Sequence, residues 1–471
     1  MKSAIVLLLT FSFVPSFALA QSQQKGYQRP AVQTPPQYRA DPNPQPDPQT
    51  LADTRWFDVF KDQKLQDLIH EALLHNYDLR EAVARIDLAR ANLGITRSEQ
   101  YPQIYGSADI TTIGRSRDGQ TILPEPVSKG RTFGSILLNL LTFELDIWGR
   151  LRKQTEAARA DLLASEEARK AVLTTIVSDV AGSYFNLREL DFELGIAKRT
   201  LVSRQESLRI ITLRQQRGVS NLLEQRQAEE LVYNATETIP ALERSIEQQE
   251  NFLSVLVGHN PGPITRGLEL TEQQMPPAVP PGIPSDLIAR RPDIRSAEES
   301  LIASGARIDV ARKAYLPRIT LTSFLGFESA SLTDLFKPSR GVWGFVPQVT
   351  QPIFTGGRLK SNVKFTQAQR DLFLVDYERT IQNAFREVSD SLIAYQKARE
   401  VTAQRQLLVT TLQDRSRLAY MRYNGGVSTL LEALDADREL FDAELSLAQS
   451  RRDELLSVVQ LYKALGGGWQ A

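Results

Sequence analysis

The chain repeats its own sequence pattern once, and this internal duplication constrains the fold more than any other feature. Asp78 in the first copy matches Asp293 in the second, 215 positions later, and Pro102 matches Pro317 at the same offset. Further along, the offset becomes 208 and then stays constant through the segment pairs 149–151 and 357–359, 218–224 and 426–432, and 257–258 and 465–466. A constant offset over many separated points predicts two copies of one structural unit.

Each copy predicts the same order of elements. A helical segment comes first, over about 65–98 and 285–314, because apolar residues recur there at steps of three and four. Two segments with β character follow in each copy, predicted at about 104–115, 133–148, 319–327 and 342–354. We therefore expect one β-hairpin in each copy and four strands in the chain.

A very long helix is predicted after each hairpin, over 150–217 and 358–424, since both stretches lack proline and place apolar residues at heptad-like steps. About 67 residues at 1.5 Å each reach roughly 100 Å. Glycines then reverse the chain, and a second helix returns to 257 in the first copy and to 465 in the second. Pro240 predicts a kink in the first returning helix.

Segments outside the repeats have distinct compositions. Lys2, an apolar run and the small-residue site Ala18-Leu19-Ala20 predict a signal peptide over 1–20, with Gln21 as the mature terminus. Residues 21–50 are rich in Gln and Pro, which predicts either an extended arm or simple disorder. The domain limits that follow are repeat 1 over 51–262, a Pro-rich linker over 263–284, repeat 2 over 285–466 and a tail over 467–471.

The composition excludes several classes of function. The 56 Lys and Arg residues balance the 56 Asp and Glu residues, so no basic excess indicates a nucleic-acid partner. The chain has no cysteine, which excludes disulfides, thiolate chemistry and lipid attachment through cysteine. It has only three histidines, none at helical ligand spacing, which argues against a metal site and triad chemistry. We expect no enzyme activity, no cofactor and no bound metal.

Four strands are too few for a closed sheet, because a minimal barrel needs about eight and exposed strand edges aggregate. No segment after the signal peptide offers about 20 consecutive apolar residues, so no transmembrane helix is predicted. Three copies would supply twelve strands. The residues therefore favour an exported, oligomeric tube that is mainly α-helical with a β-barrel part. The alternative is a periplasmic coiled-coil scaffold.

From Trp56 to Trp469 the chain resembles the outer membrane factors, the TolC-like channels, and in particular their OprM-like branch. The motifs that carry the resemblance are Arg290-Arg291-Pro292-Asp293-Ile294, Leu316-Pro317-Arg318-Ile319, the run FELDIWGR over 143–150 and the closing run LYKALGGGW over 461–469. Many members of this branch carry a lipidated cysteine at the mature terminus, and this chain departs from that pattern.

The resemblance implies a homotrimer with a 12-stranded barrel in the outer membrane of a Gram-negative bacterium and an α-helical barrel in the periplasm. It implies an exit duct of a tripartite efflux pump that conducts drugs or other small molecules. The implied partners are a periplasmic adaptor protein, an inner-membrane resistance-nodulation-division pump and outer membrane lipid. An alternative within the same family is the exit duct of a type I secretion system.

The family also implies where a gate and a docking surface lie. Adaptor hairpins are expected beside the two helix–turn–helix tips, at Gly218, Val219, Ser220, Gly425, Gly426, Val427 and Ser428. Leu431, Asp435 and Arg438 share one helical face by their spacing and match the constriction of the OprM-like branch. In TolC-like relatives the tightening network matches instead Tyr423, Glu432, Asp435 and, across from them, Glu224. The alternative for the gate residues is a solvated helix face, and the alternative for the turn glycines is simple turn chemistry.

Overall fold

The computed structural model describes residues 27–39, 50–114, 130–274 and 280–469. The predicted signal peptide over 1–20 lies outside these residues, as do parts of the predicted arm and linker. The chain divides into two compact units, Met1–Gln33 and Thr34–Ala471. In the first unit the described residues, 27–33, form no helix or strand. All elements named below belong to the second unit.

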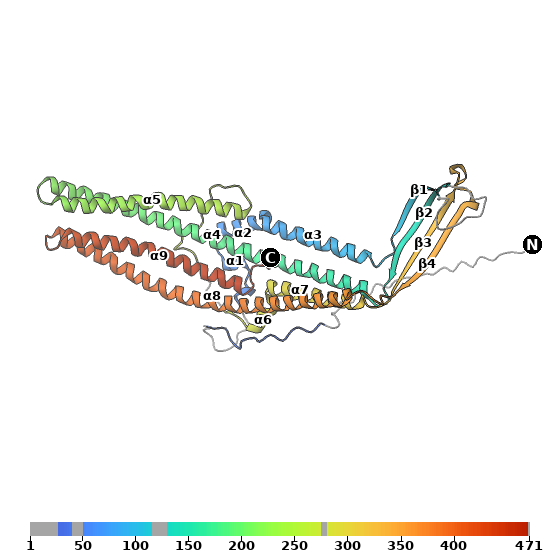
Figure 1. Cartoon of the computed structure of the whole chain (residues 1–471). Helices are drawn as coiled ribbons and strands as arrows, with labels where there is room; N and C mark the ends of the chain where they lie inside the picture. The colour runs from blue at the N-terminus through green and yellow to red at the C-terminus, as the bar shows by residue number, and fades with distance from the viewer. Residues whose placement is uncertain (1–26, 40–49, 115–129, 275–279, 470–471) are drawn as a thin grey trace, which may run out of the picture. The chain divides into compact units, whose positions relative to one another are not determined.

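The second unit is mainly helical and carries one four-stranded antiparallel sheet (Figure 1). Its elements in chain order are η1 (Leu51–Asp53), α1 (Trp56–Val59), α2 (Gln63–His75), α3 (Tyr77–Ser98), β1 (Ile104–Gly114), β2 (Gly130–Leu145), α4 (Arg150–Gln216), α5 (Leu222–Val257), α6 (Pro284–Arg290), α7 (Pro292–Lys313), β3 (Arg318–Ser329), η2 (Leu332–Asp334), η3 (Pro338–Arg340), β4 (Gly341–Thr350), α8 (Arg358–Asn424) and α9 (Leu430–Ala464). The coarse prediction of a mainly helical chain with four strands is confirmed. None of the helices in the described ranges is both long and apolar enough to cross a membrane.

The four strands pair in their sequence order, β1-β2-β3-β4, and every pair is antiparallel. The pairing of β2 with β3 shifts register between Leu140 and Phe143, which marks a β-bulge. Because the sheet is open, β1 and β4 each have one edge with no strand partner among the described residues.

Two predicted strand ends were wrong. The strand predicted over 133–148 is β2, which ends at Leu145 because the next residue begins the cap of α4. The Asp146 carboxylate accepts hydrogen bonds from the backbone N–H groups of Leu151 at 3.0 Å and Arg152 at 2.9 Å. The strand predicted over 342–354 is β4, which ends at Thr350 because its partner there, Arg318, is the first residue of β3.

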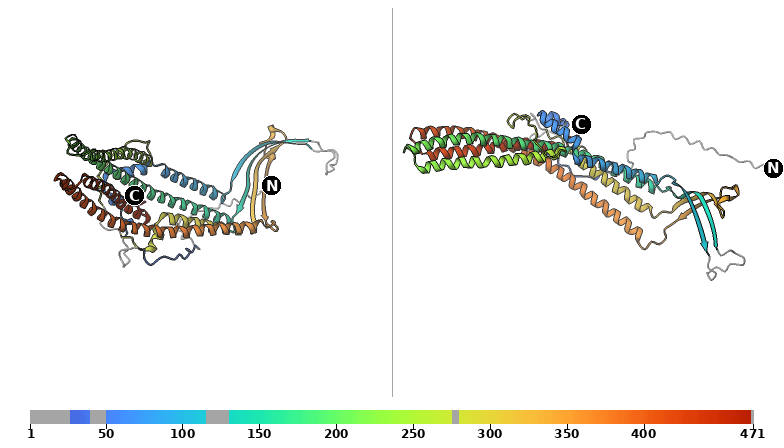
Figure 2. Two further views of the ribbon diagram at one scale, coloured as in Figure 1. Left: turned by 60° about the vertical axis from the view of Figure 1, so that its left-hand side comes forward. Right: turned by 90° about the horizontal axis from the view of Figure 1, so that it is seen from above.

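The helices lie side by side in two different orders along their length (Figure 2). Near the sheet, α3 packs on α4, α4 on α7 and α7 on α8. Toward the hairpin turns, α5 packs on α4, α4 on α9 and α9 on α8. The helices α4 and α8 run through both regions because each has 67 residues. The α4–α5 hairpin therefore touches the α8–α9 hairpin mainly through α4 and α9.

The first helical segment of each repeat breaks at equivalent positions, whereas the sequence predicted one segment. The side chain of Asn76 caps α3 by accepting from Leu79 N–H at 3.1 Å. Its equivalent in the second repeat is Arg291, which precedes Pro292 and adopts the extended backbone that proline imposes.

The same two residues tie each break to the end of a returning helix. Asn76 Nδ2 donates to the carbonyl of Leu256 at 2.8 Å. Arg291 Nη1 donates to the carbonyl of Ala464 at 2.9 Å, and this acceptor lies 208 positions after Leu256. The duplication is thus preserved in individual hydrogen bonds. The returning helix α5 continues as one helix through Pro240.

Within the predicted arm over 21–50, Tyr38 packs on α8. Tyr38 is buried, and its ring centroid lies 6.4 Å from that of Phe385. Further along, Thr50 forms an isolated antiparallel bridge with Pro281. These contacts attach the segment before repeat 1 to the second repeat and to the linker.

Candidate gate and docking tips

The two hairpin turns have the same backbone geometry. Gly218 and Gly426 both adopt positive φ, at 75° and 74°, which an L-residue with a side chain rarely adopts. Beyond each glycine a valine N–H closes the turn, from Val219 to the carbonyl of Arg214 at 2.9 Å and from Val427 to that of Arg422 at 3.0 Å. The glycine predictions therefore have a backbone reason at both turns.

Gly425 does not adopt positive φ, unlike Gly426 beside it. Its φ is −77°, in the right-handed region. A Cβ built there would lie 3.4 Å from the Met421 carbonyl oxygen, which is an ordinary contact. Only Gly426 requires glycine for conformational reasons in this turn.

The first turn is capped by side chains. Asn221 accepts from the backbone N–H of Glu224 at 2.9 Å, which begins α5. The Ser220 hydroxyl donates to the Glu224 carboxylate. In the second turn Thr429 makes no side-chain cap, and Ser428 Oγ is buried without a hydrogen-bond partner among the described residues.

Both tips expose apolar side chains. Val219 is 68% exposed and Val427 is 70% exposed. Leu223 and its equivalent Leu431 are also exposed, and Leu431 is 58% accessible. Apolar residues gathered at a surface are typical of a protein contact site.

Asp435 is held by two arginines, one from each helix of the second hairpin. Arg438 Nη2 on α9 donates to Asp435 Oδ1 at 2.6 Å. Arg415 Nη2 on α8 lies 3.5 Å from Asp435 Oδ2, and Arg415 also pairs with Glu439. Arg415 was not among the residues predicted from the sequence. The sequence could have indicated this pair, because Arg415 and Asp435 are about equally far from the turn. Residues equally far from a turn lie side by side in an antiparallel hairpin.

The neighbouring acid on this face is also paired. Glu432 Oε1 lies 3.5 Å from Arg422 Nε, again across the hairpin. At the offset of 208, the positions of Arg415, Asp435 and Glu439 are occupied in the first repeat by Ser207, Gln227 and Leu231. The charges around Asp435 therefore have no counterpart in the first repeat, whereas the positions of Arg422 and Glu432 keep Arg214 and Glu224.

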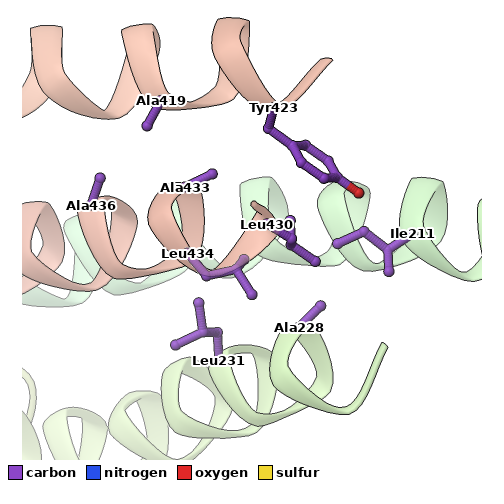
Figure 3. Packing of buried hydrophobic residues seen from close by; sticks show 9 residues of the cluster. All are labelled: Ile211, Ala228, Leu231, Ala419, Tyr423, Leu430, Ala433, Leu434 and Ala436. Carbon is purple, nitrogen blue, oxygen red and sulfur yellow. The ribbon is translucent and has the colours of Figure 1, made fainter. Parts of the chain in front are cut away.

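Tyr423 lies apart from this charged face. It belongs to a buried apolar cluster to which all four tip helices contribute (Figure 3). The members are Ile211, Ala228, Leu231, Ala419, Tyr423, Leu430, Ala433, Leu434 and Ala436. The guanidinium of Arg214 lies 4.8 Å from the Tyr423 ring centroid, and the Tyr423 hydroxyl has no hydrogen-bond partner among the described residues.

Burial raises the pKa of Tyr423; Arg214 opposes this shift, and the nearby Glu224 carboxylate adds to it. Glu224 is therefore close enough to act on Tyr423 electrostatically, as expected of a residue across from it. The structure does not join Tyr423 to Asp435, because Tyr423 faces the interior of the bundle. In one chain the candidate site thus consists of an exposed charged face, with Leu431 beside it, and a separate buried aromatic.

Among the described residues, no group of three or more His, Asp or Glu side chains is placed to hold a metal ion. The site offers apolar surface and paired charge. Such a surface can pack against another protein or line a passage.

Comparison with known proteins agrees with this arrangement. The model of the family described as outer membrane efflux protein matches residues 68–259 and 283–467, one segment in each repeat. The solvent efflux pump outer membrane protein SrpC of Pseudomonas putida is 38% identical over 418 residues, which are 88% of this chain and 87% of the relative. The cation efflux system protein CusC of Escherichia coli is 34% identical over 446 residues, which are 94% and 95% of the two chains.

A solved structure extends the likeness to three dimensions. The open state of the MtrE outer membrane channel of Neisseria gonorrhoeae has a TM-score of 0.85 and 31% identity, covering 94% of this chain and 97% of that one. These relatives favour the efflux-channel prediction over a coiled-coil scaffold and over a type I secretion duct, and they indicate a transport function and not a catalytic one. The chain belongs to the outer membrane efflux protein family.

Proposed function

We propose that this protein is the homotrimeric exit duct of a tripartite efflux pump and that it closes at its hairpin tips. Three copies place twelve strands in a barrel in the outer membrane, and their helices extend through the periplasm. The observation that carries the proposal is that each chain has two unpaired sides, or open edges, which extend from the sheet to the hairpin tips.

These open edges lie on opposite sides of the chain. On one side they are formed by β1, α3 and α5, and on the other by β4 and α8. Both sides expose large apolar side chains, such as Leu88 and Ile95 on α3, and Phe365 and Leu372 on α8. Joining the first edge of one copy to the second edge of the next is a head-to-tail contact, and such a contact closes into a ring of three when each copy is rotated by a third of a turn. A closed ring leaves no strand edge unpaired.

The sheet also supports a lipid environment. Trp343 is 76% exposed, and Phe345 and Val349, which share its face of β4, are exposed as well. Apolar side chains on the outer face of a sheet are typical of strands that contact hydrocarbon. A soluble sheet with this much exposed apolar surface would aggregate.

At the tips, three-fold symmetry places three copies of Leu431 and of Asp435 around the axis. Three carboxylates at close range repel one another unless cations balance them. Arg438 and Arg415 supply two such cations to each Asp435. The closed tip then consists of an apolar ring of Leu431 and a charge-balanced ring of Asp435.

The exposed valines at the turns, Val219 and Val427, are the proposed docking points for a periplasmic adaptor protein. The adaptor connects the duct to an inner-membrane pump of the resistance-nodulation-division type. Relatives named for solvents and for cations match most of this chain at similar identity. We therefore assign the choice of cargo to the pump and the adaptor, and assign to the duct the passage of small molecules.

The test is the double variant Leu431→Ala/Asp435→Ala, reconstituted in planar bilayers. Removing both the apolar ring and the acidic ring should raise single-channel conductance and weaken cation preference. Cells carrying it should admit large antibiotics such as vancomycin. The internal duplication offers a matched control, Leu223→Ala/Gln227→Ala, which changes the equivalent positions of the other hairpin and should leave conductance unchanged.

Mass measurement in detergent checks assembly in the same samples. Wild type and both variants should be trimers, since neither change touches the sheet and all four substituted residues lie within the first two turns of α5 or α9. A folded monomer that inserts in bilayers would contradict the duct. A double variant that assembles but keeps wild-type conductance and selectivity would mean that Leu431 and Asp435 are a solvated helix face.

A further inference from the structure

A buried arginine joins the two helical hairpins just behind the candidate gate. Arg204 lies on α4, and its side chain is 4% exposed. Its Nε donates to Asp437 Oδ2 on α9 at 3.0 Å, and its Nη1 donates to the carbonyl of Leu231 on α5 at 3.1 Å. Its guanidinium also lies 4.8 Å from the ring centroid of Phe441 on α9. One side chain on α4 therefore contacts two other helices, α5 and α9.

The acceptor on α9 lies close to the gate residue in sequence but on a different face. Asp437 follows Asp435 by two positions, and two residues of an α-helix are about 200° apart around its axis. Asp437 accordingly points to α4, whereas Asp435 faces the arginines of its own hairpin. Whatever fixes the direction of Asp437 also fixes the directions of Asp435 and Leu431.

Apolar packing and the Arg204–Asp437 pair both bear on that rotation. The residues of α9 in the buried cluster are Leu430, Ala433, Leu434 and Ala436, so half of them are small alanines. Small side chains allow helices to approach but resist rotation weakly, whereas a charge-assisted hydrogen bond is directional. The Arg204 Nη2 atom is buried and has no hydrogen-bond partner among the described residues, so the contact depends on the two bonds that are made.

We propose that Arg204 is a positioning residue for the constriction: through Asp437 it holds α9 in the rotation that points Leu431 and Asp435 toward the channel axis. Opening requires α9 to turn away from α4, which breaks this contact. The inference rests on the proposed gate and adds to it a control point on the other hairpin. Arg204 itself does not line the passage.

The first test is Arg204→Met, which keeps an unbranched side chain over Phe441 but removes the charge and both hydrogen bonds. Asp437 is then buried without its partner, and this strongly disfavours the closed arrangement. Open probability in planar bilayers should rise about tenfold or more, which corresponds to a shift of about 1.4 kcal/mol or more. The matched control is Lys198→Met, because Lys198 also lies on α4 but pairs with Glu243 on α5 at the surface, at 3.0 Å, away from α9. Its open probability should stay at the wild-type value.

A second variant separates positioning from stability. In Arg204→Met/Asp437→Leu no charge is left unpaired, so the trimer should resist heat at least as well as the wild type. It should nevertheless remain leaky, since an apolar pair does not specify a rotation. A double variant that is heat-stable and conducts as the wild type does would overturn the proposal and leave Arg204 a purely structural role.

The absence of cysteine allows a direct measurement of where α9 points. With Leu431→Cys as the only thiol, a short bismaleimide should cross-link the three copies efficiently when α9 holds its closed rotation. Adding Arg204→Met should lower the yield several-fold, and equal yields would contradict the inference. If the Leu431→Ala/Asp435→Ala variant fails to change conductance, the gate itself is wrong; if only the Arg204 variants fail, the gate stands and this inference falls.

Discussion

Alanine at Gly258 should destabilise the protein more than alanine at its repeat equivalent, Gly466. Both glycines follow a returning helix and have positive φ, 94° and 81°. At Gly258 an added Cβ would lie 2.5 Å from the carbonyl oxygen of His75 and 2.7 Å from its carbonyl carbon. At Gly466 the nearest atom is Cγ of Arg291, at 3.2 Å. The first is a severe overlap with the backbone, and the second is a tight contact that a shift of a few tenths of an ångström relieves.

The magnitudes follow from these contacts. The left-handed backbone costs alanine about 1–2 kcal/mol at either position. At Gly258 the end of α2 must also move by several tenths of an ångström, which adds about 1–3 kcal/mol as in an overpacked core. This movement would strain the hydrogen bond from Asn76 to Leu256 that ties the same junction together. We expect a loss of about 2–5 kcal/mol for Gly258→Ala and about 1–2 kcal/mol for Gly466→Ala.

The assay is thermal unfolding of each purified variant in detergent, followed by circular dichroism at 222 nm. One fixed scan rate is needed, because large assemblies often unfold irreversibly and their apparent midpoints depend on rate. The apparent midpoint should fall in the order wild type, Gly466→Ala, Gly258→Ala. Equal midpoints for the two variants, or a lower one for Gly466→Ala, would refute the reasoning from close contact.

Two further predictions concern the tip and the region where α4 crosses α9. Gly426→Val should reduce efflux-dependent drug resistance while trimers still form, because the strain is confined to the turn. Gly425→Ala, at negative φ, should behave as the wild type. Equal effects of the two variants would contradict the claim that only Gly426 requires glycine. Burial, with the charge of Glu193, raises the pKa of Glu189 to about 8 from 4.5. The folded state therefore binds more protons than the unfolded state in this window, so thermal stability should fall as pH rises from about 4.5 to 8. Glu189→Gln should flatten this dependence of thermal stability on pH. An unchanged slope would mean that Glu189 is not the group responsible.

Much of the fold was predictable from the sequence because its signals are local. Apolar spacing, the absence of proline and the position of glycine report on the backbone within a few residues. The duplication then doubled each signal, since Gly218 and Gly426 mark equivalent turns. The breaks at Asn76 and Arg291 were missed because the apolar pattern continues across them. An N-cap asparagine and an Arg-Pro pair were the available evidence.

The candidate site was predictable only in part. Helical spacing placed Leu431, Asp435 and Arg438 on one face, because three- and four-residue steps fix neighbours within a helix. The sequence could not show that Tyr423 turns inward to a buried cluster, since that depends on the rotation of α8 against its neighbours.

What the sequence alone determined is the order, length and duplication of the elements, together with the exclusion of cysteine chemistry. The tertiary structure decided which charges meet. Arg415 reaches Asp435 across a hairpin, and Arg204 reaches Asp437 over a separation of 233 residues. Such partners depend on the stagger and rotation of packed helices, and these are set by the sum of many contacts between distant segments. No local pattern in the chain records that sum.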